Sequence, residues 1–139
     1  MTEPGLDDWL MEQIGEDERH ANSMKSAYPT PWEVSDRGWM VHITADAPVF
    51  REVVRLEQSP GDLEGWLGDY VQHVDNWNPD RVLDECEIKR QVILRYRHVR
   101  EHIPESAAAP ALLDVLKDFA TSYATRDGYR DEWRPTVWV

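Results

Sequence analysis

The chain has 139 residues and a mass of 16.2 kDa, which predicts a single domain over residues 1–139. Hydrophobic residues make up 41% and charged residues 30%, a balance that excludes a disordered chain. Fifteen basic and 27 acidic residues give a formal net charge of −12, which argues against direct binding to nucleic acid or to an anionic membrane.

Three features of the sequence indicate where in the cell the protein is located. No apolar run approaches the roughly 20 residues that a membrane helix requires. The start of the chain is acidic, with Glu3, Asp7 and Asp8, where a signal peptide is basic and then apolar. Cys86 has no second cysteine to pair with, which fits a reducing compartment. We therefore expect a cytoplasmic protein.

The first predicted element is an amphipathic helix from Leu6 to about Ala27. Apolar residues recur along it with the 3.6-residue period and predict its buried face: Leu6, Trp9, Leu10, Ile14, Ala21 and Met24. Pro29 and Pro31 end the helix. The period then changes to two and predicts three short strands: Trp32–Val34, Trp39–Thr44 and Phe50–Glu57. We expect an antiparallel meander with one face covered by helices.

Two further helices are expected to begin with a capping residue followed by proline. They run from Ser59 to about Asn76 and from Asn78 to about His102. A last helix is predicted from about Pro110 to Ala124, and residues 128–139 are expected to lie across the helices. The predicted fold is therefore α+β and mostly helical, with about four helices and a small three-stranded antiparallel meander after the first.

Four segments resemble, in the same order, an uncharacterised family of actinobacteria and their phages, domain of unknown function family 6221. They are Glu16–Ala21, Pro29–Trp32, His73–Ile93 and Tyr129–Pro135. This chain has Asn78 where the family pattern has aspartate, which is an equally good helix cap. The resemblance implies a bacterial or phage source and a cytoplasmic location, and it supplies no reaction.

The segment His98–His102 fits the H-x-x-E-H string of one class of zinc peptidases. Histidines four residues apart on a helix can share one zinc ion, with Glu101 as general base. Such a site needs a third ligand, for which only Glu105 and Glu132 remain downstream. Histidines at the end of a helix also commonly interact with its dipole, and this structural interpretation is preferred.

A second metal hypothesis combines His73 and Asp75 with acidic residues of the following helix, Asp84, Glu85 and Glu87. The preferred interpretation is a histidine that closes one helix, followed by a surface ion pair between Arg81 and Glu85.

Other polar residues are assigned structural roles. The acidic Glu16–Glu18 run and Arg19 can face Arg81, Lys89 or Arg90 across a helix contact. Cys86 is expected to be a buried, inert thiol. Near the end of the chain, Trp133 is expected to anchor the tail, with Arg130, Glu132 and Arg134 tying it to a helix.

Seven tryptophans exceed the four or five, roughly, that a core of this size buries. Exposed aromatic residues among charges are typical of protein-binding surfaces. Trp77 and Trp138, together with Trp133, are the candidate partner-binding residues, although packing of the tail explains Trp77 and Trp138 equally well.

The preferred hypothesis is a non-catalytic interaction protein without a cofactor. Its partner is another protein, a host factor if the source is a phage, and a homo-oligomer is left open. One alternative is a small metal-binding protein or metal-dependent hydrolase that uses His73 or the His98/His102 pair. The other is an acidic DNA mimic, which the basic residues along the Asn78–His102 helix disfavour.

Overall fold

The computed structural model describes residues 5–36, 40–46, 51–57 and 66–135. Within these ranges the helices and strands follow one another along the chain as α1 (Leu6–Ala27), β1 (Glu33–Asp36), β2 (Met40–Thr44), β3 (Glu52–Glu57), α2 (Trp66–Asn76), α3 (Pro79–His102), α4 (Ala108–Thr121) and the short 3₁₀ helix η1 (Asp131–Trp133). The predicted α+β class, mostly helical with a three-stranded meander after the first helix, is confirmed. None of the described helices has an apolar stretch long enough to cross a bilayer.

The chain forms two compact units, which are described separately. The terminal unit combines residues 1–17 with residues 85–139, and the sheet unit consists of residues 18–84. Each unit has its own set of buried side chains.

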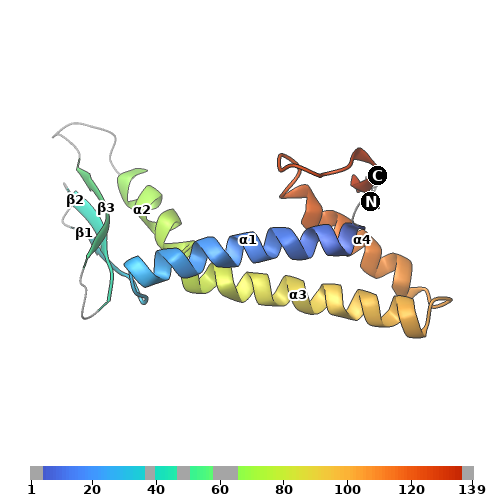
Figure 1. Ribbon diagram of the computed structural model, residues 1–139. Coiled ribbons are helices and arrows are strands. Elements are labelled where there is room, and N and C mark those ends of the chain that lie inside the picture. The colour runs from blue at the N-terminus through green and yellow to red at the C-terminus, as the bar shows by residue number, and fades with distance from the viewer. Residues whose placement is uncertain (1–4, 37–39, 47–50, 58–65, 136–139) are drawn as a thin grey trace. The chain divides into compact units, whose positions relative to one another are not determined.

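The sheet unit contains an antiparallel sheet of strand order β1-β2-β3, and α2 packs against it (Figure 1). In the register, Ile43 of β2 lies opposite Val34 of β1 and Val54 of β3. Ile43 and Val71 of α2 are fully buried and form the centre of this core. The apolar side of α2 therefore covers one face of the meander, as its period predicts.

The terminal unit is built around Trp9 of α1, which is 2% exposed. Its ring centroid lies 6.4 Å from that of Tyr123, 5.8 Å from Tyr129 and 5.2 Å from Trp133. Its Nε1 donates a hydrogen bond to the Asp127 carbonyl oxygen at 3.0 Å. Trp133 therefore anchors the C-terminal segment on α1, as the sequence predicts. Other buried residues of this core are Leu6, Leu10, Ile14, Cys86, Ile93, Leu116 and Ala120.

Some predicted boundaries are wrong. Helix α4 begins at Ala108, two residues before Pro110, because a proline within the first turn lacks only an N–H that has no partner inside the helix. The same helix ends at Thr121 instead of Ala124. Met24 was expected on the buried face of α1 but is 38% exposed, whereas Ala21 is buried as expected.

The strand edges also shift. The first strand covers Glu33–Asp36 and the third begins at Glu52. The predicted start of the second helix at Ser59, with its serine cap, lies outside the described residues.

Candidate functional site

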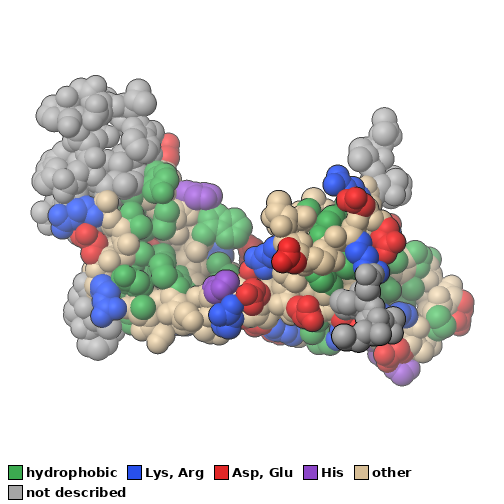
Figure 2. Space-filling model, turned by 45° about the horizontal axis from the view of Figure 1, so that its top comes forward, with side chains coloured by type: hydrophobic (Ala, Val, Ile, Leu, Met, Phe, Trp, Pro, Cys, Tyr) green, Lys and Arg blue, Asp and Glu red, His purple; other side chains and the backbone are tan. Residues whose placement is uncertain are grey.

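An exposed aromatic surface lies on α2 and the turn that follows it. Its members are Tyr70, His73 and Trp77, which are spaced three and four residues apart and therefore share one side of the helix. Tyr70 is 52% and Trp77 46% exposed, and the rings of His73 and Trp77 lie 6.4 Å apart. Figure 2 shows hydrophobic and histidine side chains next to one another on the visible face of the sheet unit.

Arg81 completes this aromatic surface. Its guanidinium carbon lies 4.3 Å from the centroid of the Trp77 ring, and its Nη1 donates a hydrogen bond to the Asn76 carbonyl oxygen at 3.2 Å. A guanidinium stacked on an indole is a favourable cation–π arrangement. The stack fixes the indole orientation while 46% of Trp77 stays accessible.

The backbone under Trp77 is held by the junction between α2 and α3. The Trp77 N–H donates to the carbonyl oxygens of His73 and Val74, both at 3.2 Å. Asn78 accepts a hydrogen bond from the Arg81 N–H through Oδ1 at 3.1 Å and donates through Nδ2 to the Asp75 carbonyl oxygen at 3.0 Å. The predicted cap at Asn78 is therefore present, and its two hydrogen bonds stabilise the turn that carries Trp77.

The residues of the His73 metal hypothesis are close in sequence, but their side chains do not form a group that could bind a metal ion. His73, Asp84 and Glu87 are exposed, and Glu87 pairs with Arg90 at 2.8 Å. Burial raises the pKa of Asp75. Among the described residues, no three histidine, cysteine or acidic side chains are grouped so that they could hold a metal ion.

The His98 and His102 rings do lie together, with centroids 4.6 Å apart on the last turns of α3. Both side chains are exposed, as are Glu101 and Glu105. Glu132, the other proposed ligand, instead pairs with Arg130 at 3.2 Å. The structure brings together the two histidines of the string, and the described part of the chain adds no third ligand.

The other two candidate tryptophans differ from Trp77. Trp133 is 6% exposed and packed against Trp9, so it offers little surface to a partner. Trp138 lies outside the described residues. Of the three candidates, only Trp77 is shown to be accessible.

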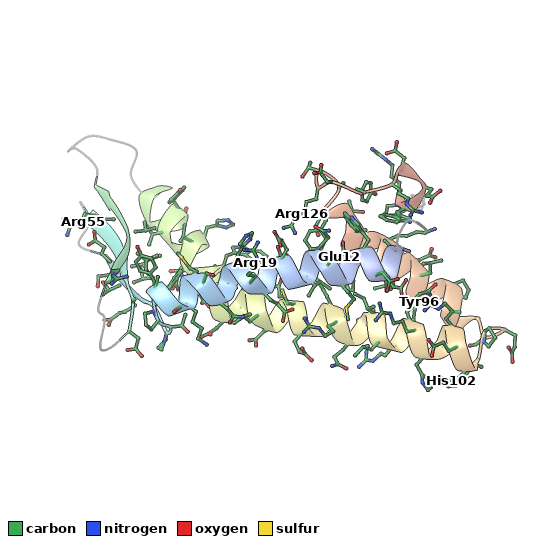
Figure 3. All side chains as sticks on the ribbon, viewed as in Figure 1. Glu12, Arg19, Arg55, Tyr96, His102 and Arg126 are labelled. Carbon is green, nitrogen blue, oxygen red and sulfur yellow. The ribbon has the colours of Figure 1, made fainter. Side chains whose placement is uncertain are left out.

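Asp17 has partners that the sequence analysis missed. Its carboxylate lies 2.6 Å from the guanidinium of Arg126, labelled in Figure 3, and accepts a hydrogen bond from the Tyr123 hydroxyl at 2.8 Å. Burial and the Asp17 carboxylate raise the pKa of Tyr123 well above its usual value. Cys86 is buried in the same unit, as predicted. These groups stabilise the packing of α1 against the C-terminal segment.

A second missed cluster surrounds the first turn of α1. Arg97 donates hydrogen bonds to Asp7 and Asp8, both at 2.7 Å, and Arg100 lies 3.4 Å from Asp7. Burial alone would raise the pKa of Asp7, but the hydrogen bond from Arg97 and the charges of Arg100 and Arg97 hold it below its usual value. Asp7 is therefore ionised at neutral pH, and the two acids are matched by two arginines.

The family model of DUF6221, a family of unknown function, matches residues 3–135. The chain therefore belongs to this family, as its motifs suggest. Neither a curated protein nor a solved structure shows significant similarity to it.

Proposed function

We propose that this chain is a non-catalytic protein-interaction protein that contacts its partner through the aromatic surface of Tyr70, His73 and Trp77, with Arg81. The observation that supports this most directly is the exposure of Trp77, at 46%, in a fixed orientation. Tryptophan and arginine are the residues most enriched among those that dominate binding energy at protein interfaces.

The geometry around Trp77 favours binding for a further reason. Binding is weakened by the entropy cost of ordering side chains that are mobile in the free protein. The Arg81 stack and the Asn78 cap already order the indole and its backbone in the free protein. The partner is another protein in the cytoplasm, and it is a host factor if the chain comes from an actinobacterial phage.

Site-specific crosslinking tests this proposal. A photoreactive amino acid replaces Tyr70, which is 52% exposed on the aromatic surface, in one sample and Ile88, which is 62% exposed on α3, in another, so that Trp77 is kept in both. We expect a discrete protein adduct from position 70 that position 88 does not form. The adduct is then identified, and its protein component is purified for affinity measurements.

Affinity measurements with the purified partner decide the outcome. Trp77→Ala should weaken binding by about 2 kcal/mol, roughly 30-fold, whereas Ile88→Ala should leave the affinity unchanged. Because Trp77 is exposed, the urea midpoint of Trp77→Ala should stay close to that of the unsubstituted chain. Equal affinities for the two variants would contradict the proposed surface.

A further inference from the structure

A pocket of about 410 Å³ lies in the terminal unit, lined by residues from α1, α3, α4 and η1. Pockets that bind small molecules range from about 300 to 1,000 Å³. Much of its wall is apolar: Leu6 and Trp133 are buried, and Leu113 and Tyr96, which is labelled in Figure 3, are half-buried. The pocket therefore has the size and the lining to hold a small molecule with an apolar body.

Both carboxylates in the pocket lining are already neutralised. Asp7 belongs to the cluster in which two arginines match two acids, and Glu132 pairs with Arg130 at 3.2 Å. Arg100 also lines the pocket, and its guanidinium carbon lies 5.2 Å from the centroid of the Tyr96 ring. A guanidinium has five N–H donors, so Arg100 retains donors for a ligand beside its contact with Asp7.

Lys117 of α4 adds one positive charge that these pairs do not match. Its side chain lines the pocket and is half-buried, and its ammonium group has no ion pair or hydrogen bond with any described residue. An ammonium group beside apolar side chains is stabilised by an anion in direct contact. The four charged residues of the lining, Asp7, Glu132, Arg100 and Lys117, sum to zero, so this pocket is less acidic than the chain as a whole, whose formal net charge is −12.

We infer that the pocket binds a small monocarboxylate with an apolar or aromatic body. The carboxylate contacts Lys117 and Arg100, and the body packs against Leu113 and Trp133. The Lys117 ammonium group, which has no ion pair with any described residue, matches the single charge of one carboxylate. A phosphate dianion would instead leave an unmatched negative charge next to the carboxylates of Asp7 and Glu132, and the low dielectric of a half-buried site makes that unfavourable.

The test uses the full chain labelled with ¹⁵N and three probes: 3-phenylpropionate, the uncharged 3-phenyl-1-propanol and inorganic phosphate. Backbone amide shifts give the binding site and the Kd of each probe. We expect shifts around Tyr96, Leu113 and Lys117 and a Kd for the carboxylate at least about tenfold below that of the alcohol, because the alcohol lacks the charge-assisted contacts. Phosphate should bind more weakly than the carboxylate.

Substitutions at Lys117 separate charge from packing. Lys117→Met keeps an unbranched side chain and should abolish the preference for the acid over the alcohol, whereas Lys117→Arg should preserve it. Lys25→Met removes a lysine that pairs with Asp80 in the sheet unit and should leave all three Kd values unchanged. The inference is wrong if the acid and the alcohol bind equally, if phosphate binds as tightly as the acid, if Lys117→Met retains the preference, or if none of the probes shifts these amides at millimolar concentration.

Discussion

Gly128 is a position where a single methyl group should disrupt the packing around Trp9. Its φ of +89° disfavours an L side chain, and a Cβ there would lie 2.6 Å from Trp9 Nε1. We expect Gly128→Ala to lower the free energy of unfolding by about 2–3 kcal/mol, since the left-handed backbone alone costs roughly 1–2 kcal/mol and Trp9 must also move. Urea denaturation gives the stability change, and near-ultraviolet circular dichroism reports the displaced indole.

Gly15 provides the matched control for this substitution. It is exposed in the interior of α1, and a Cβ there would meet nothing within 4 Å. Gly15→Ala should therefore stabilise the protein by about 0.5–1 kcal/mol through the higher helix propensity of alanine. A similar loss of stability from both variants would contradict the assigned role of Gly128.

The sequence pattern predicts which residues of α1 are buried, but it does not predict the ion-pair partners of Asp7 and Asp17. The buried positions of α1 from Leu6 to Ile14 follow from helical periodicity, which depends only on nearby residues. The partners of Asp7 and Asp17 are Arg97 and Arg126, which lie 90 and 109 residues further along the chain. Only the tertiary fold selects these arginines from the 15 basic residues of the chain.

At the scale of elements, the Asn78 cap is the feature on which the α2–α3 junction depends. Asn78→Ala removes the acceptor for the Arg81 N–H and the donor to the Asp75 carbonyl oxygen, and should cost about 1 kcal/mol of stability. Asn78→Asp keeps the acceptor and should recover most of that loss. Urea midpoints of the two variants provide the comparison, and equal midpoints would show that the side-chain acceptor does not stabilise the junction.

The order and type of the elements were predictable because period and proline placement are local signals. Asn78-Pro79 marks the start of α3 within one residue. The start of α4 was not, because Pro110 is tolerated inside a first turn and therefore does not mark where the helix begins. The aromatic surface was only partly predicted: Trp77 was a candidate, whereas the stack with Arg81 depends on the turn geometry that the structure shows.

At the scale of the whole molecule, the dominant quantity is the net charge. Acidic and basic side chains are interspersed on the visible face of the terminal unit (Figure 2), unlike a phosphate-like row of acids. Several of the ion pairs have exposed members, such as Arg134–Asp131, whose side chains are 72% and 89% exposed. Exposed ion pairs contribute little to the free energy of unfolding, so little stability is lost when salt screens them.

Salt should therefore stabilise this protein. A formal net charge of −12 destabilises the compact state by self-repulsion, and raising the ionic strength shortens the distance over which that repulsion acts. We expect the free energy of unfolding to rise by on the order of 1 kcal/mol between low salt and a few tenths molar sodium chloride. Urea denaturation at each salt concentration measures this change.

A charge-reversal variant distinguishes repulsion from a general effect of salt on burial. Glu12, Asp84 and Glu105 are exposed, so replacing each with lysine leaves the core intact. Each reversal removes one negative charge and adds one positive charge, so the three changes bring the formal net charge from −12 to −6. Self-repulsion grows steeply with net charge, so the variant should lose more than half of the salt-induced gain in stability. An undiminished gain would instead assign the effect to strengthened apolar burial, which depends on the buried surface and not on the net charge.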